Sequence, residues 1–417
     1  MKKTSLRLNL LLVLVPLAVL SILNAFNTDK PTVSILENRA LKTMPTFTAS
    51  AFFSGQYLRE YEEYFADTFI FRDSFVALSK KVAEVWSIDS STPTLVIHKG
   101  GNVSDEQTSP ALEQPKPEEP MIHAEVDTSK SLLIFNSKVM ELHRFSEYYS
   151  QYYANFLNTF SARVGGGVKI YSLLVPTQVE FLRNKKYSSL SSSQLNTINY
   201  INQHLSDQII PVDAYSALNK HSEEYIYFNT DHHWTALGAY YAYTAFMEAQ
   251  GEKPVPLGKY ETDYASPFLG YLYSACLHET VKNNPDTVHF YKPFVEYEYH
   301  YYTDRGAVQG NVLEMYWAQG NNKYGIFLGG DRPFGLIKTE VQNGKSIVVI
   351  KDSYGNAFVP FLLPHYEEIY IIDPRQFQHN LIQFIADKQI QEVLFLNYMM
   401  VTEHEGFTDL LIRIRDR

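Results

Sequence analysis

The sequence predicts an α/β fold in which a parallel sheet is covered by helices on both faces. Strand-like apolar runs at 131–135, 169–175 and 209–212 are separated by helical patterns. A β-branched run at 346–350 leads into another helical stretch, and the alternation continues towards the C-terminus. Strands that alternate with helices form parallel sheets through helical crossovers, so we expect a flavodoxin-like domain.

Length and composition exclude several classes of protein. The 417 residues, 45% of them apolar, can build one large core and a smaller module. The net charge of −10 argues against a nucleic-acid-binding protein, because such a protein needs a basic face to neutralise phosphates. The single cysteine, Cys276, excludes an intramolecular disulfide and a cysteine-based metal cluster.

Residues 1–28 have the pattern of a signal peptide or a single-pass membrane anchor. Lys2, Lys3 and Arg7 precede an apolar run at 8–26. No clear small-residue cleavage motif follows, which favours an uncleaved anchor with its basic end in the cytoplasm. In both cases we expect the rest of the chain on the extracytoplasmic side.

Three further regions differ in composition. Residues 29–99 contain helical patterns at 50–65 and 69–85, which predict a helical N-terminal module. Residues 100–122 are rich in Pro, Glu, Gln and Ser and predict a disordered linker. The main domain is then expected at 123–417.

The helices of the main domain follow from apolar spacing and breakers. A helix of about twenty residues should end at Arg163, because aromatic residues recur at a spacing of four and three glycines follow at 165–167. A second, more polar helix is expected at 190–206. The later elements are a helix ended by Pro364, a strand at 368–372, a helix to 388 and a strand at 392–396.

Residues 254–344 interrupt the alternation of strands and helices. This insertion threads many tyrosines through short alternating runs, which predicts a β-rich cap. Aromatic faces stack on sugar rings but also build sheets, so a glycan-facing lid and a purely structural cap both stay open. The turn at 329–332 is expected near the rim of the site.

The tetrad Asp-His-His-Trp at 231–234 follows an apolar run at 225–228 and opens a helical pattern. We therefore place it at a strand-to-helix corner, where α/β enzymes keep their chemistry. In an extended chain side chains at i and i+2 point the same way, which brings Asp231 and His233 together and turns His232 aside.

A candidate nucleophile, Ser353, follows the strand at 346–350 at the same kind of corner. A serine hydroxyl is a weak nucleophile unless an oriented base takes its proton. Asp231, His233 and Ser353 are therefore the three parts of a possible triad, whose distances the sequence does not contain.

The tetrad, the Lys-Asp-Ser-Tyr segment at 351–354 and the order of the elements resemble the bacterial DHHW protein family, which is similar to the SGNH-hydrolase-like proteins of alginate O-acetylation. In those proteins an Asp-x-His motif precedes the serine, the reverse of the usual SGNH order, as a circular permutation would produce. The resemblance implies Ser353 as nucleophile, His233 as base and Asp231 as its orienter. The usual SGNH block reads Gly-Asp-Ser, and Lys351 stands here in the place of the glycine.

The resemblance also implies supporting residues. Asn397 would donate to a tetrahedral oxyanion together with the Ser353 backbone N–H, and each donor is worth roughly 3–4 kcal/mol. Arg375 either binds substrate or only closes the turn at 373–375. Four residues are expected to pack around the triad: His232, Trp234, Asp352 and Tyr354.

A metal site is the rival interpretation of Asp231, His232 and His233, since carboxylate and imidazole are zinc ligands. The side chains of adjacent histidines diverge, and no other histidine recurs at ligand spacing. We therefore expect neither a metal nor another cofactor.

The function that the resemblance implies is an extracytoplasmic, SGNH-like, acyl-handling enzyme. It would be an O-acetyltransferase, or an acetylesterase, acting on a cell-surface or exported polysaccharide through an acyl-serine intermediate. A transferase would take its acetyl groups from an integral membrane O-acyltransferase. The alternative is a non-catalytic glycan-binding component of an exopolysaccharide assembly complex.

Overall fold

The structure is a computed structural model that describes residues 131–303 and 305–417 and a smaller set nearer the N-terminus. The smaller set comprises 14–15, 19–24, 26–27, 30–31, 33–34, 39–72, 74–75, 78 and 124–127. The expected linker at 100–122 and much of the apolar run lie outside the described residues. Within the described residues, no helix is both long and apolar enough to cross a membrane. The chain divides into two compact units, Met1–Thr92 and Pro93–Arg417.

The first unit contains two short paired strands and two helices. Its elements are β1 (Val33–Ser34), β2 (Arg39–Ala40), α2 (Ala49–Phe53) and α3 (Gln56–Thr68). The helix expected at 50–65 is divided at Gly55, whose φ of 77° is a left-handed conformation that glycine adopts without strain. The helix expected at 69–85 lies mostly outside the described residues.

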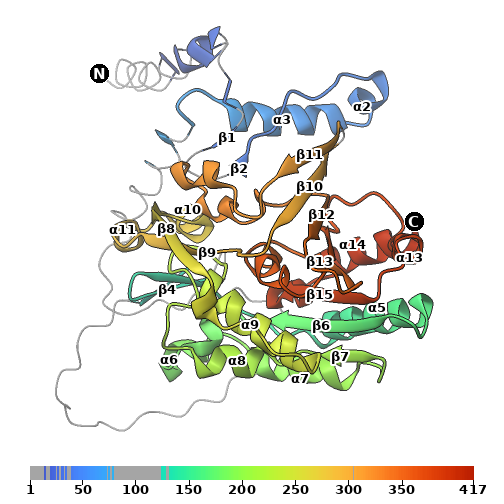
Figure 1. Cartoon of the computed structure of the whole chain (residues 1–417). Coiled ribbons are helices and arrows are strands. Elements are labelled where there is room, and N and C mark those ends of the chain that lie inside the picture. The colour runs from blue at the N-terminus through green and yellow to red at the C-terminus, as the bar shows by residue number, and fades with distance from the viewer. Residues whose placement is uncertain are drawn as a thin grey trace, which may run out of the picture. The chain divides into compact units, whose positions relative to one another are not determined.

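The second unit is built on an eight-stranded sheet with the order β11-β10-β12-β14-β13-β15-β6-β7 (Figure 1). Its strands are β6 (Lys169–Val175), β7 (Ile209–Pro211), β10 (Tyr297–Thr303), β11 (Gly306–Gly310), β12 (Phe334–Thr339), β13 (Ser346–Lys351), β14 (Glu368–Ile372) and β15 (Glu392–Tyr398). The five strands from β14 to β7 are parallel. If β13 is counted as the first strand, their order reads 2-1-3-4-5, the flavodoxin-like order. The expected α/β fold with a permuted chain order is therefore confirmed.

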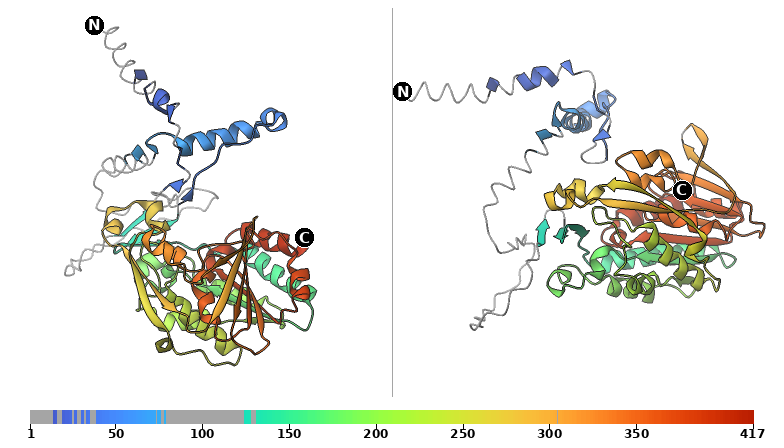
Figure 2. Two further views of the ribbon diagram at one scale, coloured as in Figure 1. Left: turned by 45° about the horizontal axis from the view of Figure 1, so that its top comes forward. Right: turned by 60° about the vertical axis from the view of Figure 1, so that its left-hand side comes forward.

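Helices cover both faces of this sheet, as two further views show (Figure 2). Side chains alternate along each buried strand: Ile347 and Val349 enter one core, and Val348 and Ile350 enter the other. One core is closed by α8 (Ala214–Lys220), α9 (Ala236–Ala249) and α12 (Gly355–Phe358). The other is closed by α5 (Glu147–Val164), α7 (Gln194–Gln203), α13 (Leu381–Asp387) and α14 (Glu405–Asp416).

The strand expected at 131–135 forms but does not join the parallel sheet. It is β4 (Leu132–Phe135), which pairs antiparallel with β3 (Ala124–Asp127) and β5 (Lys138–Glu141) in a separate sheet. Asn136 and Ser137 have positive φ angles of 48° and 63°, as in the two-residue turn of a hairpin. This turn directs β4 into a hairpin, so no crossover to the main sheet follows it.

The insertion at 254–344 is only partly a separate cap. Its strand β12 pairs antiparallel with β14 and so extends the main sheet, and β10 and β11 continue the sheet, each antiparallel to its neighbour. In contrast, β8 (Glu261–Phe268) and β9 (Asp286–Lys292) pair by themselves. The remaining short elements are η1 (Gln178–Phe181), α6 (Lys185–Ser188), η2 (Leu257–Lys259), α10 (Tyr271–Cys276), α11 (Glu279–Lys282), η3 (Met315–Gln319), η4 (Lys323–Ile326), η5 (Val359–Leu362) and η6 (Met399–Thr402).

Candidate active site

Asp231, His233 and Ser353 form one hydrogen-bonded chain. The Nε2 atom of His233 lies 2.7 Å from Ser353 Oγ, and its Nδ1 atom lies 2.5 Å from Asp231 Oδ1. Ser353 follows the carboxyl end of β13, beside β15. In the permuted order this is the boundary between strands 1 and 3, where the direction of the crossovers reverses and α/β folds bind ligands.

The segment at 231–234 is a turn rather than the end of a strand, which corrects the expected strand-to-helix corner. The run at 225–228 forms only a single bridge, between Tyr227 and Trp234. Asp231 Oδ1 also accepts the backbone N–H of His233 at 3.0 Å. A side-chain-to-backbone turn of this type, and not extended backbone, brings the two residues together.

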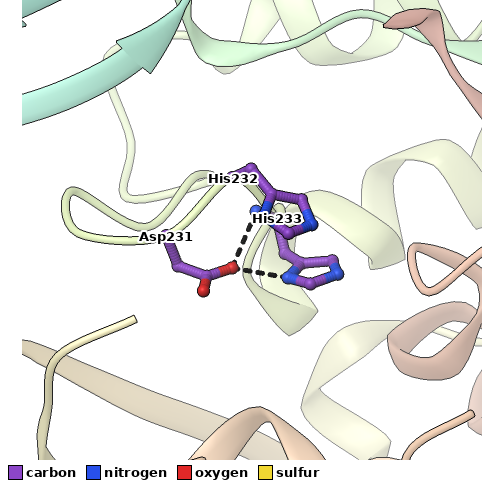
Figure 3. Close-up of side chains that lie close together, drawn as sticks. All are labelled: Asp231, His232 and His233. Atoms are coloured by element: carbon purple, nitrogen blue, oxygen red, sulfur yellow. Dashed lines mark hydrogen bonds and ion pairs between the residues drawn. The ribbon is translucent and has the colours of Figure 1, made fainter. Parts of the chain in front are cut away.

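The extended-chain reasoning predicted that the His232 side chain points away from His233. The structure shows that this prediction was wrong. The ring of His232 lies over the ring of His233, with the centroids 3.9 Å apart and the planes at 35° (Figure 3). The turn folds the two adjacent side chains to the same side. His232 therefore packs directly on the base.

The carboxylate of Asp231 is buried, and both of its oxygens accept hydrogen bonds. Oδ2 accepts the backbone N–H of Tyr271 at 2.7 Å. Burial alone would raise the pKa of Asp231, but the charges of His233 and His232, with the hydrogen bonds from His233 and Tyr271, hold it well below its usual range. A charged Asp231 keeps the proton on Nδ1 of His233, and Nε2 is then free to accept the Ser353 proton.

Two reciprocal hydrogen bonds join the segments that carry His233 and Ser353. The indole N–H of Trp234 donates to the backbone carbonyl of Tyr354 at 2.9 Å. The hydroxyl of Tyr354 donates to the backbone carbonyl of His232. Trp234 and Tyr354 are both fully buried. They therefore support the triad from within the core, although about 120 residues separate the two segments.

Asp352 and Asn397 connect the ends of β13 and β15. Asp352 accepts the backbone N–H groups of Tyr354 and Tyr398, each at 2.9 Å, and the side-chain amide of Asn397 at 3.4 Å. The amide oxygen of Asn397 accepts the hydroxyl of Tyr153 at 3.0 Å. Burial raises the pKa of Asp352 against the effect of these hydrogen bonds. Asp352 thus braces the strand ends.

The two expected oxyanion donors differ in whether they already make a hydrogen bond within the protein. The backbone N–H of Ser353 makes no hydrogen bond with any described residue, so it can donate to a developing oxyanion. The fully buried Asn397 side chain already bonds to Asp352. Its oxyanion role stays a prediction.

Arg375 lies in a network of charges behind the Ser353 turn. Its guanidinium donates to Asp373 at 2.8 Å and to Asp331 at 2.6 Å, and its backbone N–H also donates to Asp373. Closing the turn is therefore the role that these contacts support, and contact with substrate stays a prediction. Asp331, from the turn expected at the site rim, also accepts Lys351 Nζ at 3.0 Å.

Lys351, which replaces the glycine of the usual SGNH block, is only 1% exposed. Its side chain lies against Gly355, where an added Cβ would come within 2.6 Å of Lys351 Cβ. The position in this turn where a side chain would not fit is thus Gly355, and not position 351. Burial opposes the ionisation of Asp331, but Lys351 and Arg375 outweigh it and hold the pKa of Asp331 below its usual range.

Asp331→Ala should destabilise the protein by about 2–3 kcal/mol, because it leaves the buried ammonium of Lys351 without its carboxylate. The folded state lowers the pKa of Asp331, so this contribution is complete above about pH 4 and is lost as the pH falls further. Urea unfolding at several pH values measures it. The control Glu261→Ala breaks an exposed ion pair with Lys292 and should change little. Equal effects of the two variants would contradict the prediction.

Tyr324 and Asp286, both in the insertion, were not identified from the sequence. The ring of Tyr324 stacks on His233, with the centroids 3.8 Å apart and the planes at 14°, and its hydroxyl donates to the Ser353 carbonyl at 3.0 Å. No motif or spacing in the sequence marks either residue, because neither lies near the Asp231 or Ser353 segments in the chain.

Asp286 holds the turn that precedes Asp231. Its carboxylate accepts the hydroxyl of Tyr225 at 2.5 Å and the backbone N–H groups of Asn229 and Thr230 at 2.9 and 2.7 Å. Burial raises the pKa of Asp286 against these hydrogen bonds. A carboxylate from β9 thus positions the start of the turn that carries Asp231 and His233.

The ligand atoms of Asp231, His232 and His233 lie within 4.8 Å of one another, as in a metal site. However, both ring nitrogens of His233 are bonded, to Asp231 and to Ser353, and both oxygens of Asp231 accept hydrogen bonds. An ion would have to displace these bonds. The donor set fits a triad better than a metal centre.

Known proteins share this fold and sequence pattern. The model of the DHHW protein family matches residues 122–372, which include Asp231, His233 and Ser353 but not Arg375 or Asn397. A DHHW family protein of Eubacterium siraeum is 33% identical, with 70% of this chain and 98% of that chain covered and a TM-score of 0.64.

Two other solved structures are more distant. Bacillus cereus PatB1, solved with a sulfonyl adduct, is 20% identical over 65% of this chain and 97% of its own, with a TM-score of 0.56. The O-acetyltransferase domain of Pseudomonas putida AlgJ is 12% identical over 71% of this chain and 99% of its own, with a TM-score of 0.40. No curated protein matches the sequence. By the family match and the similarity to the Eubacterium siraeum protein, this chain belongs to the DHHW family.

Proposed function

We propose that this protein is a serine-dependent, acyl-handling enzyme, an O-acetyltransferase or acetylesterase that acts on a cell-surface or exported polysaccharide. The observation that carries the proposal is the hydrogen-bonded chain of Asp231, His233 and Ser353. Its two ends come from distant segments and are braced by buried side chains, as a site that must keep its geometry requires.

The first half of the reaction would form an acyl-enzyme. Ser353 Oγ attacks the carbonyl carbon of an acetyl ester while its proton passes to Nε2 of His233. The resulting oxyanion can accept the Ser353 backbone N–H. The intermediate then collapses, the bond to the leaving alcohol breaks, and His233 returns the proton to that alcohol. Asp231 holds the charged imidazole throughout.

The second half decides between transfer and hydrolysis. Either a sugar hydroxyl or water gives its proton to His233 and attacks the carbonyl carbon of the acetyl-Ser353 ester. The bond between that carbon and Ser353 Oγ then breaks, and His233 returns the proton to Oγ. A transferase would need an acetyl source, and an integral membrane O-acyltransferase is the partner we propose. The proposal places the catalytic domain on the extracytoplasmic face of the membrane, held there by the N-terminal segment, or in a secreted form if that segment is cleaved.

One observation favours the alternative, a non-catalytic glycan-binding component of an exopolysaccharide assembly complex. The amide of Asn397, expected to be the second oxyanion donor, is bonded to Asp352. With one free donor at Ser353, the oxyanion would be held less well. A chemical test of Ser353 separates the two functions.

Phenylmethylsulfonyl fluoride should label Ser353, because an activated serine displaces fluoride from a sulfonyl fluoride and the base takes its proton. Intact-mass spectrometry of the full chain should show a single adduct, and peptide mapping should place it on Ser353. Ser346→Ala, a change at the other end of β13, should label like the wild type, and Ser353→Ala should not label. Absence of an adduct together with absence of p-nitrophenol release from p-nitrophenyl acetate would support the non-catalytic alternative.

A further inference from the structure

Tyr324, in η4 of the insertion, lies with its ring against the imidazole of His233. The two centroids are 3.8 Å apart, and on the same imidazole the ring of His232 has its centroid 3.9 Å away. Two rings this close cannot share one face of a five-membered ring without overlapping, so Tyr324 and His232 cover opposite faces. The imidazole is enclosed, and its edge atoms reach Asp231 and Ser353.

Tyr324 also contacts the residue that carries the nucleophile. Its hydroxyl donates to the backbone carbonyl of Ser353 at 3.0 Å, and the residue is 5% exposed. Burial and the nearby carboxylates, Asp231 first among them, raise the pKa of the Tyr324 phenol well above its usual range, so the hydroxyl keeps its proton. One side chain thus fixes both the plane of the base and the backbone of the nucleophile.

We propose that Tyr324 is a positioning residue of the catalytic centre: it holds the ring of His233 in line with Ser353 Oγ and stabilises the imidazolium formed during acyl transfer. The face of an aromatic ring carries negative partial charge and attracts a cation stacked on it. The inference rests on the proposed function, because the imidazolium forms when Ser353 gives up its proton. The insertion would then complete the site and not only cover it.

The other described groups that face the His233 ring are few. Asp231 lies at its Nδ1 edge, and the ring of Tyr354 lies 5.3 Å away. Burial and the charge of His233 lower the pKa of His232, and burial raises the pKa of Tyr354, so neither ring is charged at neutral pH. Without the face of Tyr324, only Asp231 would stabilise the imidazolium strongly.

Two substitutions test the contribution of the Tyr324 ring separately from that of its hydroxyl. Tyr324→Leu removes the aromatic face, whereas Tyr324→Phe keeps the face and removes only the donor to Ser353. In kcat/KM for p-nitrophenyl acetate against pH, we expect the acid limb of Tyr324→Leu to move down by about half a pH unit, since its base holds a proton less well. We expect kcat to fall about tenfold or more and KM to change little. Tyr324→Phe should keep the acid limb of the wild type, and its kcat should fall less than that of Tyr324→Leu, because it loses only the hydrogen bond to the Ser353 carbonyl.

A further variant, whose side chain has nearly the shape of tyrosine, keeps the test valid if Tyr324→Leu does not fold. Incorporation of 3,4,5-trifluorophenylalanine at position 324 keeps the ring but withdraws charge from its face, so the acid limb should move in the same direction as in Tyr324→Leu. An acid limb at the wild-type position in both variants overturns the proposal. If the wild type neither releases p-nitrophenol nor forms the sulfonyl adduct on Ser353, the proposed function fails instead, and an NMR titration of the His233 ring protons in the same variants still decides the inference.

Discussion

Ser353→Ala and His233→Ala should each lower kcat/KM for p-nitrophenyl acetate by about 10³- to 10⁶-fold, measured by p-nitrophenol release. The first removes the nucleophile, and the second removes the base that lies 2.7 Å from it. The double variant should be little worse than either single variant, because members of a triad act as a unit. Asp231→Asn should lose less, about 10²- to 10⁴-fold, because Ser353 and His233 remain.

Three controls make this result specific. Ser346→Ala is the same chemical change on the same strand and should keep full activity. His232→Ala should keep more activity than His233→Ala, because His232 packs on the base and bonds neither to Asp231 nor to Ser353 through its side chain. A chelator should have no effect. Loss of activity with chelator, or equal loss from the two histidine variants in folded protein, would point to a metal site.

Gly270→Ala should lower the proposed esterase activity almost as strongly as Asp231→Asn, although Gly270 has no side chain. A Cβ at this position would lie 2.3 Å from both Cβ and Oδ2 of Asp231. The backbone has little freedom to withdraw, because the N–H of Gly270 is bonded to Thr230 Oγ1 at 2.9 Å. We expect a drop in kcat/KM of about 10²-fold or more, and a destabilisation of roughly 1–3 kcal/mol in urea unfolding.

The matched control is Gly258→Ala in η2, where an added Cβ meets no atom within 4 Å. It should leave activity and stability close to those of the wild type. Full activity in Gly270→Ala would show that the Asp231 carboxylate can move without cost. The supposed rigidity of the triad would then be wrong.

The sequence predicted the parallel sheet because its strands are continuous apolar runs between helical patterns. The strands at 169–175 and 368–372 have the expected bounds. The strand at 131–135 was assigned to the wrong sheet, because a hairpin turn at Asn136 and Ser137 decides its partner and such turns are weak signals in a single sequence. In the insertion, alternating tyrosines predicted strands but could not show that β12 pairs with β14.

For the site, the sequence and the family resemblance identified the three residues of the proposed triad and three of the residues that brace it, Trp234, Asp352 and Tyr354. They missed Tyr324, Asp286 and Gly270. Asp231, His233 and Ser353 stand in short motifs with the right residue types. Tyr324 contributes the face of its ring, which stacks on His233, and Gly270 contributes the space that the Asp231 side chain occupies. Both residues lie in the insertion. Properties of this kind depend on three-dimensional contact and leave no local pattern.

The distance along the chain between the base and the nucleophile bears on how the protein folds. His233 and Ser353 are 120 residues apart, and the bonds of Trp234 and Tyr354 span similar loops. Closing a loop of this length lowers the entropy of the chain before the new contacts can stabilise it. We therefore expect contacts between such distant residues to form late. The helices and the hairpin of β4 and β5 are local and can form earlier. The proposed triad is thus assembled at the end of folding, and a partly folded chain has secondary structure before His233 reaches Ser353.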